Sequence, residues 1–130
     1  MFTLEQIKAA HSKVKSGADF PAYVQELIAL GVTNYETYVA DGHTDYFGEP
    51  GFTISSDKKY EVLVIAVDAD VTQFEEKLKA HQQGKTDYLT FCSDCAKSGV
   101  EKWKVDMQAM TCIYFDKAGN KMLAETIPAA

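Results

Sequence analysis

The cysteines form the most conspicuous chemical motif of the sequence, because Cys92 and Cys95 stand three positions apart and Cys112 is the third cysteine. A structural zinc site needs four ligands, so the three thiols and one histidine, of which His81 is nearest in sequence, would have to converge. A thioredoxin-like pair lies at a helix N-terminus, but this pair falls about two turns into the helix expected from Thr86. We therefore interpret the cysteines as small core residues, with zinc and redox roles as alternatives.

A second group of residues could do acid–base or metal chemistry. His43 stands between Asp41 and Asp45 and could act as a general base, although no nucleophile stands beside it in sequence. Asp68 and Asp70 follow an apolar run and could hold magnesium, but Asp70 also has the position of a helix N-cap. The sequence therefore predicts an exposed turn around His43, no catalytic residue and no cofactor.

Aromatic side chains supply the remaining candidates for a binding site. They fall on expected strands or at their ends: Tyr35, Tyr38, Tyr46, Phe47, Phe52, Trp103, Tyr114 and Phe115. A pocket between the two halves of the chain could take a small molecule, since ligand pockets are lined mainly by apolar and aromatic groups. The residues that we expect to line it are Tyr35, His43, Tyr46, Trp103 and Tyr114.

Composition and charge exclude several classes of protein. With 130 residues, of which 46% are hydrophobic and 25% charged, the chain has the size and composition of one globular domain. The net charge is -6, and the longest basic cluster is Lys58-Lys59, so nucleic acid is not an expected partner. The sequence contains neither an apolar run of about 18 residues nor the order of a signal peptide, so we expect a cytoplasmic protein with no membrane partner.

Capping residues and glycines predict four helices. Thr3 with Gln6 has the pattern of a capping box, and Pro21 is tolerated in the first turn of the second helix. The expected helices run between these signals: from Thr3 to Gly17, from Asp19 to Gly31, from Asp70 to Gly84, and from Thr86 or Asp87 to Gly99.

Alternating apolar residues and turn signals predict the strands. The run Tyr60–Val67 is apolar on both faces, which indicates a central strand. The other expected strands are Val32–Val39, Thr44–Phe47, Phe52–Ile54, Val100–Met107, Met110–Phe115 and Lys121–Ile127. These elements predict one α+β domain over residues 1–130, with four helices packed on a mainly antiparallel sheet.

The two halves of the chain resemble each other. When the sequence is shifted against itself so that Asp19 falls on Asp87, the segment Asp19–Gly51 superposes on Asp87–Gly119 without a gap, and we call this the half-chain shift. The identical pairs include Gly31 with Gly99 and Tyr46 with Tyr114. We interpret this as an internal repeat of a helix-helix-strand-strand unit, with halves of about 3–67 and 70–127, and chance similarity of turns is the alternative.

The C-terminal half carries a family resemblance. The segments His81–Cys92, Gly99–Trp103, Met110–Asp116 and Glu125–Pro128 are similar to the YbcV-like family of small bacterial proteins, which are often labelled phage envelope proteins. The resemblance implies an α+β domain, sometimes linked with prophage regions, and it implies no catalytic residues. A role in a virion envelope does not fit a chain without a membrane span or anchor.

The sequence favours a non-enzymatic binding or protein-interaction module, because nearly every polar motif has a structural explanation. Strand faces that point away from the helices need cover, and a homodimer would supply it. An unknown protein or small molecule is the other expected partner. The alternative function is a small enzyme or metal-dependent hydrolase, which would bring His43, Asp68 and Cys92 together in one cleft.

Overall fold

Helices and strands follow one another in two similar series in the computed structural model, which describes residues 2–14, 19–49 and 51–128. The first series is α1 (Leu4–His11), α2 (Phe20–Leu30), β1 (Val32–Tyr38), β2 (Thr44–Gly48) and β3 (Phe52–Ser55). The second series is α3 (Val71–Gln82), α4 (Tyr88–Lys97), β4 (Val100–Asp106), β5 (Thr111–Asp116) and β6 (Lys121–Thr126). The α+β class predicted from the sequence is confirmed.

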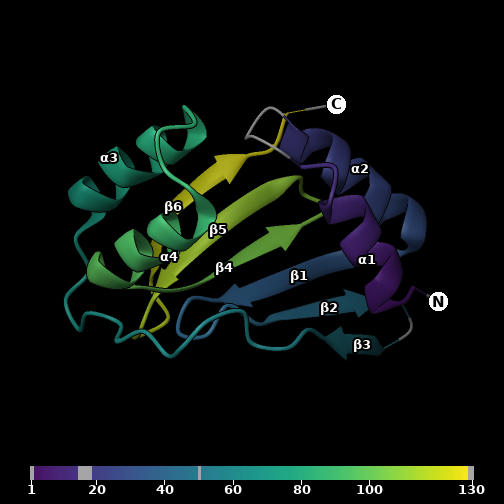
Figure 1. The fold of residues 1–130 in the computed structure, drawn as a ribbon, viewed down its shortest axis with the longest axis horizontal. Coiled ribbons are helices and arrows are strands. Elements are labelled where there is room, and N and C mark those ends of the chain that lie inside the picture. The colour runs from purple at the N-terminus through teal and green to yellow at the C-terminus, as the bar shows by residue number, and fades with distance from the viewer. Residues whose placement is uncertain (1, 15–18, 50, 129–130) are drawn as a thin grey trace.

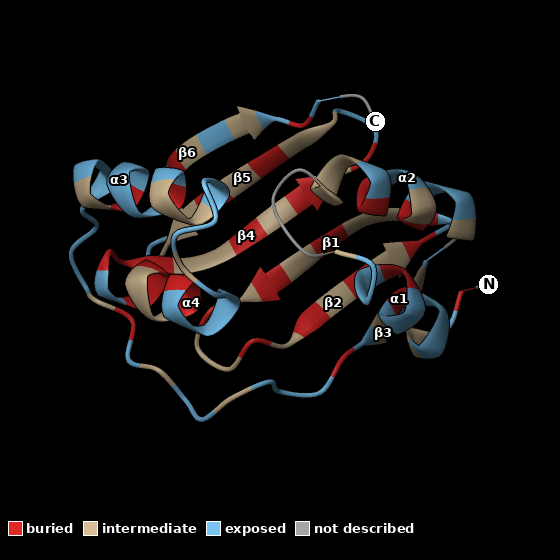
Figure 2. Cartoon of the chain, turned by 45° about the horizontal axis from the view of Figure 1, so that its top comes forward, coloured by how far each residue is buried: buried red, intermediate tan, exposed pale blue. Residues whose placement is uncertain are grey.

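The strands form one antiparallel sheet in the order β3-β2-β1-β4-β5-β6. All four helices pack on the same face of this sheet. In Figure 1, α1 and α2 lie at the right and α3 and α4 lie at the left. Side chains that face the helices form the core, seen as buried segments in Figure 2. The opposite side of the sheet carries no helix of the described chain, and we call it the helix-free face.

The helices begin where the capping residues predict. Thr3 and Gln6 form a capping box, and Asp70 and Asp87 accept backbone hydrogen bonds at the starts of α3 and α4. Gly31 ends α2 in the left-handed conformation, with a φ of 102°. α1 ends at His11, earlier than expected, and the expected end at Gly17 lies outside the described residues. Among the described helices, none is long and apolar enough to cross a membrane.

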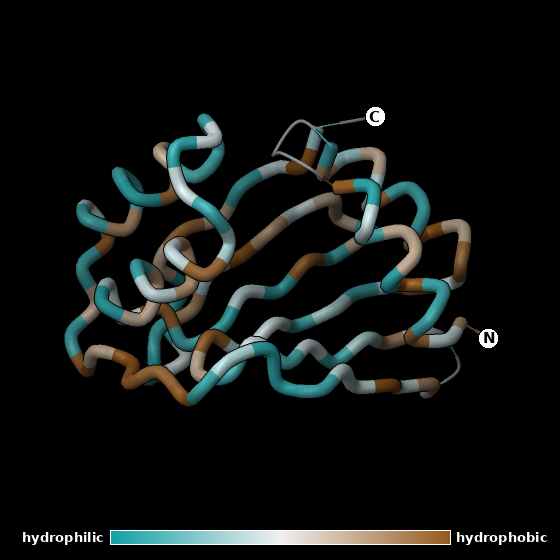
Figure 3. Tube along the Cα trace, in the orientation of Figure 1, coloured by the Kyte–Doolittle hydropathy of each residue, from teal (hydrophilic) through white to brown (hydrophobic). Residues whose placement is uncertain are grey.

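The expected central strand Tyr60–Val67 is wrong. Residues 56–70 form an irregular connection between β3 and α3, which we call the connector. Its valines are largely exposed, with Val62 at 71%, Val64 at 88% and Val67 at 81%, and its apolar stretch lies at the lower left of Figure 3. The connector backbone donates five hydrogen bonds to residues outside the connector: to Thr44, Asp41, Ala40, Ala96 and Ser98. The centre of the sheet is formed by β1 and β4 instead.

The two series correspond at the half-chain shift found in the sequence. This shift places Val32–Tyr38 of β1 on Val100–Asp106 of β4, and the two strands share one pattern of burial and a register shift at the same place. The hydrogen bond from Val39 to Glu101 likewise corresponds to the one from Met107 to Thr33. Each series has three strands, whereas the unit predicted from the sequence has two.

Candidate functional site

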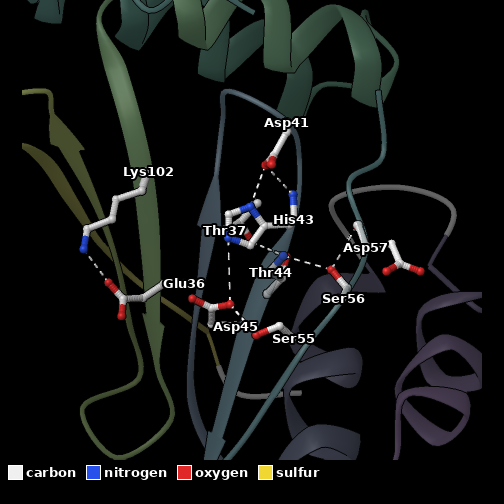
Figure 4. Close-up of polar contacts among 10 residues, drawn as sticks. All are labelled: Glu36, Thr37, Asp41, His43, Thr44, Asp45, Ser55, Ser56, Asp57 and Lys102. Carbon is white, nitrogen blue, oxygen red and sulfur yellow. Dashed lines mark hydrogen bonds and ion pairs between the residues drawn. The ribbon is translucent and has the colours of Figure 1, made fainter. Parts of the chain in front are cut away.

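The β1–β2 turn places His43 at one end of the helix-free face (Figure 4). Asp41 and His43 flank Gly42, whose φ of 77° allows the tight turn. One oxygen of Asp41 accepts a hydrogen bond from the His43 backbone N–H at 3.0 Å and contacts ring Nδ1 at 2.6 Å. On the other side of the ring, Nε2 lies 3.8 Å from Asp45, whose carboxylate accepts a hydrogen bond from Ser55. Two carboxylates therefore hold the imidazole.

Aromatic rings and a lysine continue this cluster across the sheet. The Tyr38 and His43 rings are stacked, with centroids 4.6 Å apart and an interplanar angle of 5°. The Lys102 ammonium lies 5.6 Å from the ring centres of both Tyr38 and Phe115 and pairs with Glu36. The hydrogen bond to Glu36 raises the pKa of Lys102, so the lysine stays charged between two rings. The face thus combines aromatic surface with paired charges.

The polar contacts of the His43 ring are with carboxylates. Within the described residues, no hydroxyl or thiol hydrogen-bonds to His43 Nε2, and the Ser55 hydroxyl donates to Asp45 instead. A nucleophile activated by a histidine must lie within hydrogen-bond reach of the ring. His43 therefore closes the turn and adds a polar, partly exposed ring to the helix-free face.

Asp41 gives the turn a measurable pH dependence. Burial raises its pKa, but hydrogen bonds from the His43 ring and backbone outweigh burial and hold the pKa below its ordinary value. A carboxylate with a lowered folded-state pKa stabilises the fold above its unfolded-state pKa, near 3.8, and this contribution disappears as the pH falls through the folded-state pKa. Acid should therefore weaken the β1–β2 turn.

We expect Asp41→Asn to lower the free energy of unfolding by about 1 kcal/mol at pH 7, the size of a typical hydrogen-bond contribution. The difference from wild type should shrink from pH 5 downward and vanish near pH 2, because both proteins then carry a neutral side chain. Urea unfolding followed by Trp103 fluorescence at each pH measures this. Glu76→Gln on exposed α3 is the control, and an equal deficit of Asp41→Asn at pH 7 and pH 2 would contradict the assignment.

The five expected pocket residues divide between the two faces of the sheet. Four of them are buried on the helix-covered face, where Tyr35 pairs with Tyr46 and Trp103 with Tyr114. Their rings lie 5.6 Å and 6.2 Å apart, respectively, in the core between the two helix pairs. Burial raises the pKa of Tyr35 and Tyr114 well above the ordinary value. His43 lies on the helix-free face, apart from these four.

The three cysteines are buried on the helix-covered face. Cys92 and Cys95 lie on the inner side of α4, and Cys112 lies on β5. Burial raises the pKa of all three thiols, to about 12 for Cys112. In the described part of the chain, no group of three His, Cys, Asp or Glu side chains is placed to hold a metal ion.

The residues of the alternative enzyme site lie apart. Cys92 is buried on the inner side of α4, whereas His43 stacks on Tyr38 on the other face of the sheet. Asp68 is exposed on the connector, and its backbone oxygen packs against Gly99. Asp70 caps α3 by accepting a hydrogen bond from the Gln73 backbone at 3.0 Å. The described structure therefore gathers no catalytic set from these side chains.

Glu36 and Lys102, which organise the centre of the helix-free face, were not predicted from the sequence as site residues. A signal for Glu36 was present, because the alternation in β1 puts Tyr35 and Thr37 on one face and their neighbours on the other. The role of Lys102 depends on the pairing of β1 with β4, which places it opposite Tyr38. Strand order was not predicted, so this contact could not be.

Comparison with known proteins gives a family and no function. The family model described as Protein of unknown function (DUF1398) matches residues 8–126, which is most of the chain. No curated protein matches the sequence.

Proposed function

The chain belongs to the DUF1398 family, and we propose that it is a non-enzymatic interaction protein whose helix-free face docks a second copy of the chain. One observation carries the proposal: the sheet is covered by helices on one face, while its other face bears half-buried aromatic and aliphatic side chains among charges. These side chains are Tyr38, Phe47, Ile113 and Phe115. An antiparallel sheet can be solvated on one face, but an apolar patch of this kind is typical of an interaction surface.

The charges on this face favour a second copy as the partner. A row of cross-strand neighbours runs from Asp45 through Glu36 and Lys104 to Ile113. The first half of the row is acidic, and the second half is basic and apolar. A second copy turned about an axis along the strands would lay the acidic half of one sheet on the basic half of the other. Two sheets packed in this way form a sandwich about 10 Å thick.

We also propose that the two series of elements are copies of one helix-helix-strand-strand-strand unit. The support is the agreement between the half-chain shift and the bounds of β1 and β4. At this shift Glu36 corresponds to Lys104, and these two residues are also cross-strand partners at the middle of the sheet. An axis relating the halves would pass between them, so the acidic and basic sides of the helix-free face are corresponding positions that diverged in charge.

We expect the wild-type chain to sediment as a dimer at micromolar concentration and Ile113→Asp to sediment as a monomer. In the proposed dimer Ile113 lies opposite Asp45 of the second copy, so the added carboxylate meets a like charge in a desolvated interface, which costs several kcal/mol. Sedimentation velocity over a range of concentrations measures the association.

Val71→Asp is the matched control, because Val71 is a β-branched residue on α3 with partial exposure, away from the helix-free face. It should leave the dimer intact, and thermal unfolding should show both variants folded. A monomeric wild type at these concentrations would contradict the proposed dimer. A catalytic turnover that depends on His43 or Asp68 would contradict the non-enzymatic proposal.

The resemblance to YbcV-like proteins adds a biological setting to the proposal. It supports a prophage-associated interaction protein rather than a component of a virion envelope. Finding the gene beside prophage genes in bacterial genomes would support this setting, and finding it consistently among unrelated housekeeping genes would contradict it.

A further inference from the structure

The connector backbone is bound to the β1–β2 turn and to the end of α4. The Leu63 backbone N–H donates to the Ala40 carbonyl at 2.7 Å, and the Ala66 N–H donates to the Ala96 carbonyl at 2.9 Å. Between these donors, Ile65 is 6% exposed and forms the one fully buried side chain of the apolar stretch, all of which the structure describes. Two backbone hydrogen bonds and one apolar anchor therefore define how the end of α4 binds this segment.

The corresponding place in the first half is a groove of about 410 Å³ at the end of α2. It is lined in part by Ile28, Gly31 and Gln108. At the half-chain shift, Ile28 corresponds to Ala96, and Gln108 corresponds to Ala40. The two residues whose carbonyls hold the connector, Ala40 in the first half and Ala96 in the second, thus have counterparts in the wall of this groove.

The groove lacks the covering that the connector gives to the second half. Connector backbone passes so close to Gly99 that a Cβ added there would lie 2.9 Å from Ala69 Cα. At Gly31, the counterpart of Gly99, the nearest atom to an added Cβ is a ring carbon of Phe2 at 3.9 Å. Ile28 is accordingly 39% exposed, whereas Ala96 is 3% exposed.

We infer that this groove is the docking site for an extended apolar peptide segment of a partner protein, seated as the connector is seated on Ala40 and Ala96. The inference rests on the proposed correspondence between the two halves and not on the proposed function of the helix-free face.

The contacts of the connector with Ala40 and Ala96 indicate which groups a ligand of the groove must have. The ligand backbone donates two hydrogen bonds, spaced as those of Leu63 and Ala66 are, to the carbonyls of Gln108 and Ile28. Each carbonyl has two lone pairs, and Ala96 already accepts from both Ala66 and Gly99 in the second half. A branched apolar side chain between the two donors fills the groove as Ile65 does.

The charge of the groove narrows the choice of ligand further. Glu49 lines the groove beside Gly31 and Gln108. A carboxylate on the ligand would lie near this glutamate, and like charges at an interface oppose binding. An acidic residue beside the apolar anchor is therefore disfavoured.

The test uses the isotope-labelled full chain and a synthetic peptide with the sequence of residues 61–69, extended by two lysines for solubility. Titration followed by amide NMR should give saturable shifts at Gly31, Met107 and Gln108. The same peptide with aspartate in place of the Ile65 residue should bind at least about tenfold more weakly, because burial of an isoleucine side chain contributes about 1.5–3 kcal/mol. Absence of saturable shifts at these residues would overturn the inference.

Two variants test whether the peptide binds in the groove or nonspecifically to exposed apolar side chains. Ile28→Asp puts a charge on the groove wall and should weaken peptide binding at least about tenfold, while Leu89→Asp, at a 58% exposed position on α4, should leave it unchanged. Shifts at Ala40 and Ala96 would show exchange with the connector and overturn the inference. Concentration-dependent shifts at Gly31 without peptide would assign the groove to a second copy and also overturn it. Ile113→Asp should bind the peptide as the wild type does, so loss of the dimer can be distinguished from loss of the peptide site.

Discussion

Gly99→Ala should destabilise the protein by about 3 kcal/mol, whereas Gly31→Ala should cost about 1 kcal/mol. Both glycines follow a helix in the left-handed conformation, with φ of 88° at Gly99 and 102° at Gly31, so both variants carry the cost of placing a Cβ there. Only Gly99 adds a collision, because its new Cβ would lie 2.9 Å from the Ala69 Cα and from the Asp68 carbonyl oxygen. Backbone atoms cannot turn away as a flexible side chain can.

Urea unfolding of the two variants, followed by Trp103 fluorescence, measures the difference. Gly31→Ala is the internal control, since it keeps the backbone cost and meets only Phe2 at 3.9 Å. The double variant should lose the sum of the two effects, because the sites lie in different halves and share no contact in the described chain. Equal losses at the two glycines would mean that the connector is not held against α4 as the structure has it.

Local signals predicted the ends of most elements because each signal acts over a short stretch of chain. The Thr3 capping box, the Asp70 cap and the left-handed Gly31 are all formed by groups that are close neighbours in sequence. Such contacts depend little on the rest of the fold. The two segments matched by the half-chain shift contain similar local signals. The bounds of β1 and β4 therefore correspond at this shift.

The position of Tyr60–Val67 in the fold could not be predicted from the sequence, because an apolar run does not show which residues it contacts. Its backbone hydrogen bonds run from Leu63 to Ala40 and from Ala66 to Ala96, and both partners are distant along the chain. These partners depend on how the β1–β2 turn and α4 meet at the end of the sheet. Ile65 is the buried residue of the run, and Tyr60, Leu63 and Ala66 are partly buried, whereas Val62, Val64 and Val67 are exposed, so the apolar pattern does not mark one buried strand.

The candidate site was likewise predicted only where its contacts are local in sequence. The turn around His43 was predicted, since Asp41 and Gly42 form it locally. The contacts of His43 with Tyr38, and of Tyr38 with Lys102, depend on strand pairing. Tyr35, Tyr46, Trp103 and Tyr114 lie together on the helix-covered face, whereas His43, grouped with them from the sequence, lies on the helix-free face. The sequence does not state which face of a strand the helices cover.

The thiols should be almost unreactive in the native protein. We expect a thiol reagent at pH 8 to label all three cysteines in urea and to label the native chain at least about a thousandfold more slowly. For Cys112, a pKa of about 12 against an ordinary value near 9 lowers the thiolate fraction at pH 8 by roughly a thousandfold, and the thiolate is the reacting form. Cys92 and Cys95 are fully buried, so their labelling requires opening of the fold.

The same experiment separates the three interpretations of the cysteines. A redox pair would show one thiol that reacts fast in the native state, and a zinc site would show protection that a chelator removes together with a change in native mass. If the cysteines are core residues, they are labelled only when the fold opens, so the labelling rate follows the equilibrium constant of unfolding. Gly99→Ala should then raise the native labelling rate by the same factor as it raises this constant. Because raised thiol pKa values let the unfolded state ionise first, stability and protection should both fall as the pH rises from about 9 to about 12. Protection that stayed constant while stability fell would contradict the assignment of these residues to the core.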